Sequence, residues 1–311
     1  MKERLRAAVI GVGYLGRFHA QKYAALPDVD LIGVVDANPA QAERVARELG
    51  VAAYPAITAL EGRIDLVSVA STTESHHDVV RACLQQGLHV LVEKPITVTV
   101  AEADALIALA DEHGRVLQVG HLERFNPAWL AVREQIARPV FIEAHRMAPF
   151  KPRGIDVSVV LDLMIHDLDL ILPLVDSPLK ELRASGVSVL TDGVDIANAR
   201  LEFENGCVAN ITASRTSPAP LRRMRIFQHH EYLSIDFGER TIGISRRRDA
   251  LIEGEPPIET DTHQQPPGDA LMTEIRAFVD AVRNGTPPPV SGRDGREALA
   301  VALEIERLIA R

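Results

Sequence analysis

A lysine stands where a predicted buried strand ends. Residues Leu88–Val92 are apolar and β-branched, as in a central strand of a parallel sheet, and Glu93, Lys94 and Pro95 follow. Pro95 cannot donate a hydrogen bond to a neighbouring strand, so pairing should stop there. Lys94 is therefore expected at the carboxyl end of a strand, where open α/β sheets bind ligands, and partial loss of water would suit it to proton transfer. The alternative is a solvated lysine at a strand end.

A glycine-rich turn precedes this lysine in the chain. Gly11, Gly13 and Gly16 match G-x-G-x-x-G and stand between a predicted strand, Leu5–Ile10, and a predicted helix. In that context the glycines allow a tight turn, close approach of a pyrophosphate and packing of the helix on the strand. The N-terminus of the helix would receive the phosphates. The motif predicts a dinucleotide cofactor.

Residues at two further strand ends refine this cofactor prediction. Asp36 ends the second predicted strand, where a carboxylate accepts hydrogen bonds from the adenosine ribose and repels a 2′-phosphate, so NAD is favoured over NADP. Ser71 and Thr72 follow another predicted strand at the same edge, and His76 is either a cofactor contact or a structural residue at a helix start. The predicted cofactor contacts are Gly11, Gly13, Tyr14, Leu15, Gly16, Asp36, Ser71, Thr72, His76, Glu93 and Lys94.

Residues 160–175 are predicted to form an apolar helix that carries acids and a histidine. Asp162, His166 and Asp169 lie at i, i+4 and i+7, on one helical stripe, and Asp167 follows the histidine. Burying such groups unpaired is costly, which favours a site where His166 carries a proton or binds substrate and a carboxylate sets its tautomer. A satisfied core histidine is the alternative. A metal site is disfavoured because no second histidine stands at ligand spacing.

Basic residues gather before this helix. Arg146, Lys151 and Arg153 could hold a diphosphate through charge-assisted hydrogen bonds, although solvated loop charge is an equally good interpretation. Arg124, at the start of a helix expected over residues 124–137, is a further candidate. The predicted substrate contacts are Lys94, Arg124, Arg146, Lys151, Arg153, Asp162 and His166, and no metal ligand is predicted.

The order of the predicted elements indicates two domains. Strands and helices alternate over residues 1–121, which predicts an α/β Rossmann domain with a doubly wound parallel sheet. Residues 122–311 are mostly strand, which predicts an α+β domain with a large, mostly antiparallel open sheet. Residues 255–268 contain four prolines and are predicted to be loop. A C-terminal helix over about 294–311 is a candidate to pack back on the first domain.

The composition is that of a soluble globular protein. The 311 residues are 46% hydrophobic and 25% charged, which is ample for a buried core. A net charge of −9 disfavours nucleic acid as a partner, and no apolar run has the length of a membrane span. Cys83 and Cys207 lie far apart without metal spacing and are predicted to be reduced core residues. With an N-terminus that leads straight into a strand, this predicts a cytoplasmic protein.

Three motifs together resemble one enzyme family. The segments Gly11–Gly16, Glu93–Pro95 and Asp162–Asp169, in this order, are similar to those of the Gfo/Idh/MocA oxidoreductases, and the resemblance covers nearly the whole chain. It implies Lys94 and His166 as the catalytic pair, with Asp162 next to them. It also implies a second domain whose open sheet often forms a homodimer or homotetramer interface.

The sequence also departs from the usual family pattern. Ser71–Thr73 stands where relatives often have Thr-Pro-Asn, Met164 stands where glycine is usual, and Asp167 makes a His-Asp pair that many relatives lack. Residues 148–153 and 162–167 resemble a bacterial subgroup that oxidises nucleotide sugars. This implies oxidation of the 3-hydroxyl of UDP-N-acetylglucosamine on the way to 3-amino lipid A. Another NAD(P)-dependent sugar or cyclitol dehydrogenase or reductase, and an NAD-sensing protein without turnover, are the alternatives.

Overall fold

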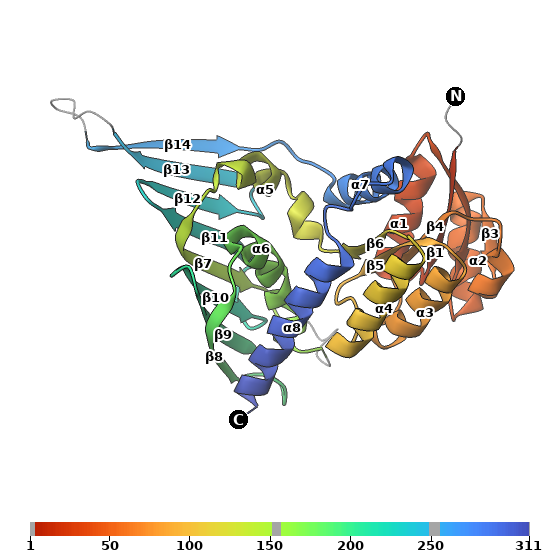
Figure 1. The fold of residues 1–311 in the computed structure, drawn as a ribbon, viewed down its shortest axis with the longest axis horizontal. Coiled ribbons are helices and arrows are strands. Elements are labelled where there is room, and N and C mark those ends of the chain that lie inside the picture. Colours follow the sequence, from red (N-terminus) through yellow and green to blue (C-terminus); the bar gives the residue numbers. More distant parts are fainter. Residues whose placement is uncertain (1–3, 151–156, 249–255, 311) are drawn as a thin grey trace. The chain divides into compact units, whose positions relative to one another are not determined.

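The computed structural model describes residues 4–150, 157–248 and 256–310, which form two compact units (Figure 1). The first unit comprises Met1–Leu122 and Leu271–Arg296, and the second comprises Glu123–Ala270 and Glu297–Arg311. Residues 271–296 therefore group with the first unit, whereas the sequence placed all residues after 121 in the second domain.

The first unit is built on a six-stranded parallel sheet. Its strand order is β3-β2-β1-β4-β5-β6, so the chain winds outward from β1 in one direction and then from β4 in the other. This order makes a switch point between β1 and β4, where open α/β sheets bind ligands at the carboxyl ends of the strands. The predicted doubly wound sheet is confirmed. Its strands are β1 (Leu5–Ile10), β2 (Val29–Val35), β3 (Ala52–Tyr54), β4 (Leu66–Val69), β5 (His89–Glu93) and β6 (Leu117–Gly120).

Local sequence signals start the helices of this unit. Asn38 accepts a hydrogen bond from the backbone N–H of Ala40, and Pro39 takes the first helical position. Thr99 and Glu102 form a capping box, in which each side chain accepts from the other residue's N–H. The helices are α1 (Tyr14–Ala25), α2 (Pro39–Leu49), α3 (Thr73–Gln85), α4 (Val100–Glu112) and α7 (Ala270–Asn284), with a 3₁₀ turn at Ile57–Leu60.

Helix α7 shows why the end of the chain does not belong wholly to the second unit. Its apolar face carries Leu271, Ile275 and Phe278, which are buried in the same core cluster as Ala7 and Val9 of β1. Full burial of one large apolar side chain contributes about 1.5–3 kcal/mol. The continuous second domain predicted from the sequence is therefore corrected by packing between segments about 260 residues apart in the chain.

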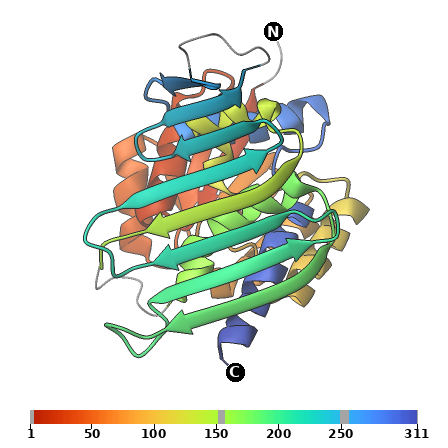
Figure 2. The ribbon, with the colours of Figure 1, turned by 90° about the vertical axis from the view of Figure 1, so that its left-hand side faces the viewer.

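The second unit is an eight-stranded sheet in the order β14-β13-β12-β11-β7-β10-β9-β8. Strands β7 and β10 pair in parallel and the other neighbours are antiparallel, as predicted. Figure 2 shows the strands side by side from the open face of the sheet. They are β7 (Pro139–Met147), β8 (Leu179–Val187), β9 (Ile196–Phe203), β10 (Val208–Ser214), β11 (Leu221–Gln228), β12 (Glu231–Asp236), β13 (Thr241–Arg247) and β14 (Ile258–Gln264).

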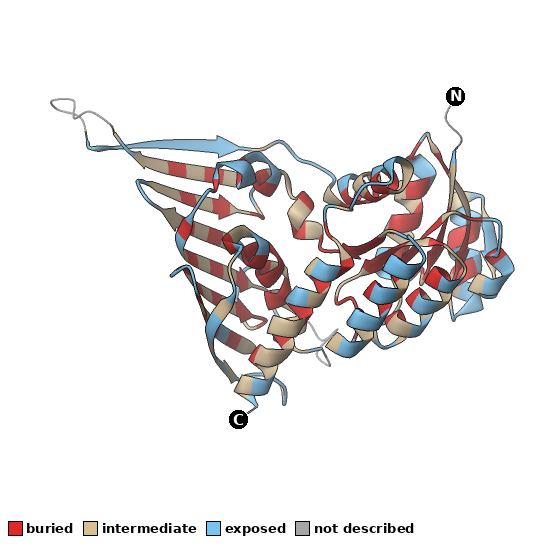
Figure 3. Ribbon diagram, viewed as in Figure 1, coloured by how far each residue is buried: buried red, intermediate tan, exposed pale blue. Residues whose placement is uncertain are grey.

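Helices cover the other face of this sheet. Buried and less buried residues alternate along its inner strands, as the colours of Figure 3 show, because successive side chains point to opposite faces. The buried residues share one core cluster with α6 and with the later part of α8. The helical elements are α5 (Pro127–Val132), α6 (Ile165–Val175) and α8 (Gly292–Ile309), with 3₁₀ turns at Leu122–Phe125 and Arg133–Gln135 and a π turn at Val160–Met164.

Two predicted elements of the second unit are wrong. Residues 255–268 were expected to be loop, but Ile258–Gln264 pairs residue by residue with β13 as the edge strand β14. Every residue of β14 is exposed, so the strand has no buried apolar face that its sequence could reveal. The single helix expected over residues 124–137 is instead three short turns, with α5 in the middle.

None of the described helices combines the length and the hydropathy needed to cross a membrane. Cys83 and Cys207 are both buried and free, as expected. Burial raises the pKa of the Cys83 thiol to about 12, so this side chain is an uncharged core residue.

His89 at the start of β5 should make stability fall in mild acid. Burial, with the Arg115 charge adding to it, lowers the pKa of His89 to about 4, and its Nδ1 accepts from the Val116 N–H at 2.9 Å. In the unfolded chain the imidazole takes up a proton near pH 6.5. The contribution of His89 to the free energy of unfolding is therefore fully present above that pH and is lost as the pH falls toward 4. Because the ring is only half-buried, we expect a loss on the order of 1 kcal/mol.

The substitution His89→Asn keeps an acceptor for the Val116 N–H and removes the titration. Thermal unfolding at pH 7 and pH 4.5 is therefore expected to show a smaller drop in Tm for this variant than for the unaltered chain. Equal drops would show that His89 does not contribute to acid sensitivity.

Candidate functional site

The glycine turn after β1 packs directly against the loop after β4. Gly11 has φ +78°, and a Cβ at this position would lie 2.6 Å from the backbone nitrogen of Ser71. A Cβ at Gly16 would lie 1.8 Å from the carbonyl oxygen of Gly11, so only glycine lets α1 approach the turn. A Cβ at Gly13, by contrast, would meet no atom of the described chain within 4 Å. Gly13 therefore borders open space at the N-terminus of α1.

The start of α1 is suited to an anion. Gly13 is its N-cap and has no side chain to cap the first N–H groups, and no acid stands in the first turn. These N–H groups and the positive end of the helix dipole favour phosphate oxygens. Tyr14 and Leu15 are exposed beside this turn, at 70% and 37% of their surface. The predicted pyrophosphate position thus fits the backbone that the glycines allow.

Asp36 ties the glycine turn to the end of β2. One carboxylate oxygen accepts from the Val12 N–H at 2.8 Å, and the other accepts from the Asn38 N–H at 2.8 Å. A carboxylate oxygen has more than one acceptor site, so this geometry leaves capacity for ribose hydroxyls. Its negative charge stands where a 2′-phosphate would be repelled, which fits NAD.

The register of the sheet brings Lys94 to the same edge. Ile10 pairs with Val69, and Val69 pairs with Val92, so the residues that follow β1, β4 and β5 leave the sheet side by side. Lys94 comes directly after the last residue of β5 and is half-buried. The glycine turn, the Ser71 loop and Lys94 are thus neighbours at one edge, as the sequence predicted.

His76 holds two loops together and does not fit the cofactor contact expected of it. The imidazole is 1% exposed, with Nδ1 at 2.9 Å from the carbonyl oxygen of Pro95 and Nε2 at 3.3 Å from that of Ser71. Burial lowers the pKa of His76, which favours the neutral ring, so one of the two ring nitrogens donates to its carbonyl oxygen and the other only lies close to the second one. This correction assigns His76 to the connection between the loop after β4 and the turn after β5. Thr72, which begins α3 without capping it through its side chain, is exposed at the same loop.

A series of buried, hydrogen-bonded side chains next to β5 was not predicted from the sequence. Glu93, expected to contact the cofactor, accepts a hydrogen bond from His19 Nε2 at 2.9 Å. His19 Nδ1 lies 3.1 Å from Ser68 Oγ, which lies 2.9 Å from the Tyr23 hydroxyl. The only sequence signal was a histidine and a tyrosine four residues apart in the helix after the glycine motif.

The second unit carries the other set of predicted residues. Asp162 lies in the π turn that precedes α6, and His166 lies in the first turn of α6; both are partly exposed. A π turn departs from the uniform α-helix predicted for residues 160–175, so the spacing of Asp162 and His166 is not the assumed helical one. Such turns are frequent at functional sites.

Asp169, predicted to share one helical face with Asp162 and His166, forms an ion pair with Arg124. Arg124 Nε lies 2.8 Å from one Asp169 carboxylate oxygen and Nη2 lies 2.7 Å from the other. The Asp169 side chain is fully buried and Arg124 is 13% exposed. This two-point contact orients Arg124 toward α6, and its proposed contact with substrate stays a prediction.

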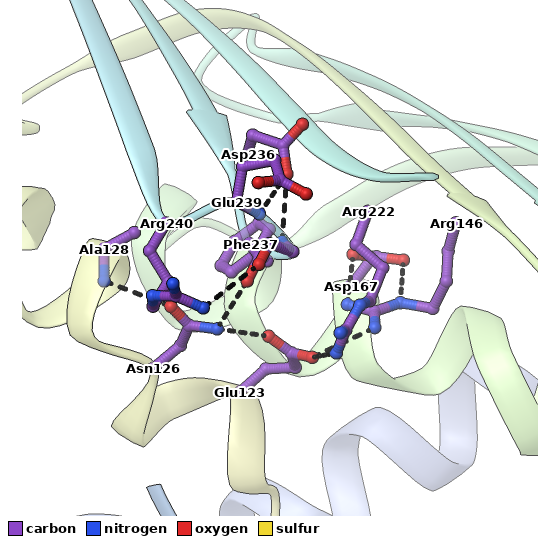
Figure 4. A network of polar contacts seen from close by, with 11 residues as sticks. Glu123, Asn126, Ala128, Arg146, Asp167, Arg222, Asp236, Phe237, Glu239 and Arg240 are labelled. Atoms are coloured by element: carbon purple, nitrogen blue, oxygen red, sulfur yellow. Dashed lines mark hydrogen bonds and ion pairs between the residues drawn. The ribbon is translucent and has the colours of Figure 1, made fainter. Parts of the chain in front are cut away.

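Arg146 lies in an internal network that does not fit its predicted diphosphate contact (Figure 4). Its guanidinium is 4% exposed and pairs with both Asp167 oxygens at 2.9 and 3.0 Å and with Glu123 at 3.2 Å. Burial alone would lower the pKa of Arg146, but the Asp167 and Glu123 carboxylates outweigh it and raise the pKa. Glu123 also accepts from Arg222 at 3.1 Å.

These contacts correct one prediction. Arg146 is held by carboxylates inside the unit, against its predicted contact with a diphosphate. Both oxygens of Asp167 accept from Arg146, and the role of Asp167 beside His166 stays a prediction. Neither ion pair of Arg146 could be predicted from neighbouring residues, because the partners lie 21 and 23 residues apart in the sequence. The two other basic residues of the predicted substrate set, Lys151 and Arg153, lie outside the described residues.

Comparisons with known proteins cover both units. The family description "Oxidoreductase family, NAD-binding Rossmann fold" matches residues 5–121, and "GFO/IDH/MocA C-terminal domain" matches residues 133–232. The chain is 44% identical to UDP-N-acetylglucosamine 3-dehydrogenase of Acidithiobacillus ferrooxidans over 97% of this chain and 96% of the relative. It is 27% identical to scyllo-inositol 2-dehydrogenase (NAD(+)) of Bacillus subtilis over 97% and 93% of the two chains.

A solved structure agrees with these sequence matches. UDP-N-acetylglucosamine 3-dehydrogenase GnnA from Acidithiobacillus ferrooxidans aligns with a TM-score of 0.93 at 43% identity, covering 98% of this chain and 97% of that one. The glycine turn, the Asp36 carboxylate and the end of β5 therefore lie in a domain that matches the NAD-binding Rossmann description. The chain belongs to the Gfo/Idh/MocA family of NAD-binding oxidoreductases.

Proposed function

We propose that this protein oxidises the 3-hydroxyl of UDP-N-acetylglucosamine to a 3-keto sugar with NAD⁺. The observation that carries the proposal is the 44% identity, over nearly all of both chains, to a relative with that activity in its name. The placement of Lys94 at the same sheet edge as the predicted cofactor turn supports it, because proton and hydride must leave adjacent atoms of the substrate.

Each proposed catalytic residue has one role. The cofactor, when bound, supplies an acceptor for the hydride that leaves C3. Lys94 accepts the proton of the 3-hydroxyl, and general-base help of this kind contributes about 10²–10⁴-fold. His166 is proposed to hydrogen-bond the substrate and Asp162 to accompany it, as the family resemblance implies. Arg124 also pairs with a carboxylate, that of Asp169, but its side chain is 13% exposed against 4% for Arg146, so Arg124 stays the proposed diphosphate contact of the two.

We propose a homodimer or homotetramer formed through the open face of the eight-stranded sheet. Three aromatic residues lie together there, with ring centroids 5.8 Å apart for Phe141–Phe227 and 4.9 Å apart for Phe227–Tyr232. An aromatic cluster on an exposed sheet face favours a protein partner. Light scattering coupled to gel filtration tests the mass, and a monomer at micromolar concentration would refute it.

The setting of the reaction is also proposed. The product would be a 3-keto sugar ready for amination toward 3-amino lipid A. Two free, buried cysteines support a reducing compartment, so we place the reaction in the cytoplasm.

The decisive assay mixes the protein with NAD⁺ and one candidate substrate at a time. UDP-N-acetylglucosamine is expected to generate NADH absorbance and a product lighter by two hydrogens in the mass spectrum. The 27% identity to an inositol dehydrogenase supports a second candidate, a cyclitol or free-sugar dehydrogenase. Turnover of myo-inositol or a free hexose with UDP-N-acetylglucosamine inert would favour it. NAD binding without turnover of any of these would favour an NAD-sensing protein.

Asp36 should determine the choice of cofactor. Replacing it with alanine removes a charged acceptor for the ribose hydroxyls and the repulsion of a 2′-phosphate, along with the tether to Val12. A hydrogen bond to a charged group is worth about 1.5–3 kcal/mol, so kcat/KM for NAD⁺ is expected to fall about 10-fold or more. The NADP⁺ to NAD⁺ ratio of kcat/KM should rise. Asp30→Asn, at a half-buried position on β2, is the control, and an unchanged ratio in Asp36→Ala would count against the assignment.

A further inference from the structure

We infer that His19 is a positioning residue for the reaction, which acts through Glu93 on the strand end that carries Lys94. The inference rests on the proposed catalytic role of Lys94. His19 belongs to α1, the helix that follows the glycine turn, and its Nε2 lies 2.9 Å from Glu93 Oε1. Glu93 is the last residue of β5, and Lys94 is the next residue in the chain.

The hydrogen-bonded side chains that lead away from Glu93 are completely buried. His19, Ser68 and Tyr23 have no exposed surface, and Tyr23 belongs to an apolar core cluster together with Val12 and Leu91. Burial raises the pKa of the Tyr23 hydroxyl, so it stays protonated. A buried polar group without a partner costs about 1–3 kcal/mol, which makes a chain of three such groups costly unless each bond is made. The three distances of 2.9, 3.1 and 2.9 Å satisfy that requirement.

One arrangement of protons uses every donor among these hydrogen-bonded side chains. The Glu93 carboxylate only accepts, so His19 Nε2 donates to it. His19 Nδ1 then accepts from the Ser68 hydroxyl, and Ser68 Oγ accepts from the Tyr23 hydroxyl. The hydrogen bonds therefore run in one direction, from Tyr23 to Glu93. This order sets the tautomer and the ring orientation of His19, as a second hydrogen bond usually does.

The order carboxylate, histidine, serine also occurs in hydrolytic triads, but burial excludes that chemistry here. Ser68 lies in β4 with no exposed surface, so no substrate reaches its hydroxyl. Glu274 of α7 lies close to His19 and Glu93, with the possible ligand atoms of the three residues within 4.8 Å of one another. With Nε2 donating to Glu93 and Nδ1 accepting from Ser68, both ring nitrogens of His19 are engaged, and the role that we infer for His19 is to hold Glu93.

Glu93 is confined from the opposite side as well. It pairs with Gly120 of β6, and a Cβ at Gly120 would lie 2.9 Å from the carboxylate carbon of Glu93. The carboxylate thus fills the space that a side chain at position 120 would occupy. Held by His19 on one side and by β6 on the other, Glu93 has little freedom, and the peptide that leads to Lys94 shares that restriction. A displacement of about 1 Å at a catalytic group can cost on the order of 10²-fold in rate.

Two isosteric variants separate positioning from a general structural role. In His19→Gln the amide nitrogen takes the place of Nε2 and keeps the donor to Glu93. In His19→Asn the amide oxygen takes the place of Nδ1 and keeps the acceptor for Ser68, but the donor to Glu93 is lost. We expect His19→Asn to lower kcat by about 10- to 100-fold and His19→Gln, which loses only the acceptor for Ser68, to lower it by a smaller factor, with KM for both substrates little changed. Each kcat is divided by the number of NAD⁺-binding sites, so that misfolded protein is not counted.

The controls make the outcome unambiguous. His113→Gln, at the exposed end of α4, should leave kcat unchanged. If His19→Asn does not fold, Ser68→Ala is the second test, because it removes the donor that orients Nδ1 and should also lower kcat per site. Equal kcat in the two His19 variants, or a difference confined to KM, would overturn the inference, as would full activity of Ser68→Ala. Failure of the proposed catalytic role of Lys94 is distinguished by Lys94→Met, which would then turn over substrate at the unaltered rate, and failure of the proposed function by the absence of turnover in the unaltered chain.

Discussion

Replacing Lys94 with methionine is expected to lower kcat by about 10²- to 10⁴-fold while NAD⁺ binding persists. Methionine keeps an unbranched side chain but cannot accept a proton, and loss of one positioned general base typically costs this much. The backbone of β5 pairs with β4 as far as Val92 and with β6 as far as Glu93, so the substitution after the strand end should leave the sheet intact. NADH formation measures kcat, and a fluorescence titration measures the affinity for NAD⁺.

Lys180→Met, in the exposed part of β8, is the matched control and should keep full activity. A rate for Lys94→Met equal to that of the unaltered chain would remove Lys94 from the mechanism and leave His166 as the proposed proton acceptor. Loss of NAD⁺ affinity with an unchanged kcat would instead make Lys94 a binding residue.

Replacing Asp167 with alanine is expected to destabilise the protein by about 3–5 kcal/mol. The substitution leaves the Arg146 guanidinium, 4% exposed, with Glu123 as its one remaining partner among the ion pairs of the described residues. Breaking a buried ion pair by removing one partner has this cost because a charge stays buried without compensation. Urea unfolding gives the free energy of unfolding, and the expected loss is a large part of the stability of an ordinary domain.

Glu181→Gln provides the comparison, because the Glu181–Arg183 pair is exposed and such pairs contribute at most about 1 kcal/mol. The double variant Arg146→Met, Asp167→Leu removes both charges and should recover part of the loss. If Asp167→Ala lowers stability no more than Glu181→Gln, the network of Figure 4 does not hold the second unit together.

Local patterns sufficed for the predicted cofactor turn and for the end of β5. Gly16 is required by the carbonyl of Gly11, a few residues earlier, and Gly11 by the backbone that follows the neighbouring strand β4, so their spacing recurs with this strand order and is visible in the sequence. Lys94 follows an apolar run that can only be an inner strand, and parallel pairing then places its end beside those of β1 and β4. Such features repeat wherever this strand order occurs, which is why three short motifs sufficed to identify the family.

Charged side chains were harder to assign from the sequence. Arg146 and His76 were both given ligand contacts because their chemistry allows them. The structure places Arg146 against Asp167 and Glu123 and places His76 against two backbone carbonyls. A basic residue in a sequence does not reveal whether its partner is a substrate or a carboxylate of the same chain, and only the burial of the pair distinguishes these cases.

The sequence by itself determined the parallel sheet, the glycine turn, Asp36 and the strand end at Lys94, because each depends on residues close together in the chain or on a regular strand order. Only the tertiary structure decided what surrounds them. His19 meets Glu93 across 74 residues, Arg222 meets Glu123 across 99, and α7 returns near the end of the chain to cover the first sheet. These contacts follow from which buried polar groups must find partners once the core has formed, and no local pattern encodes that choice.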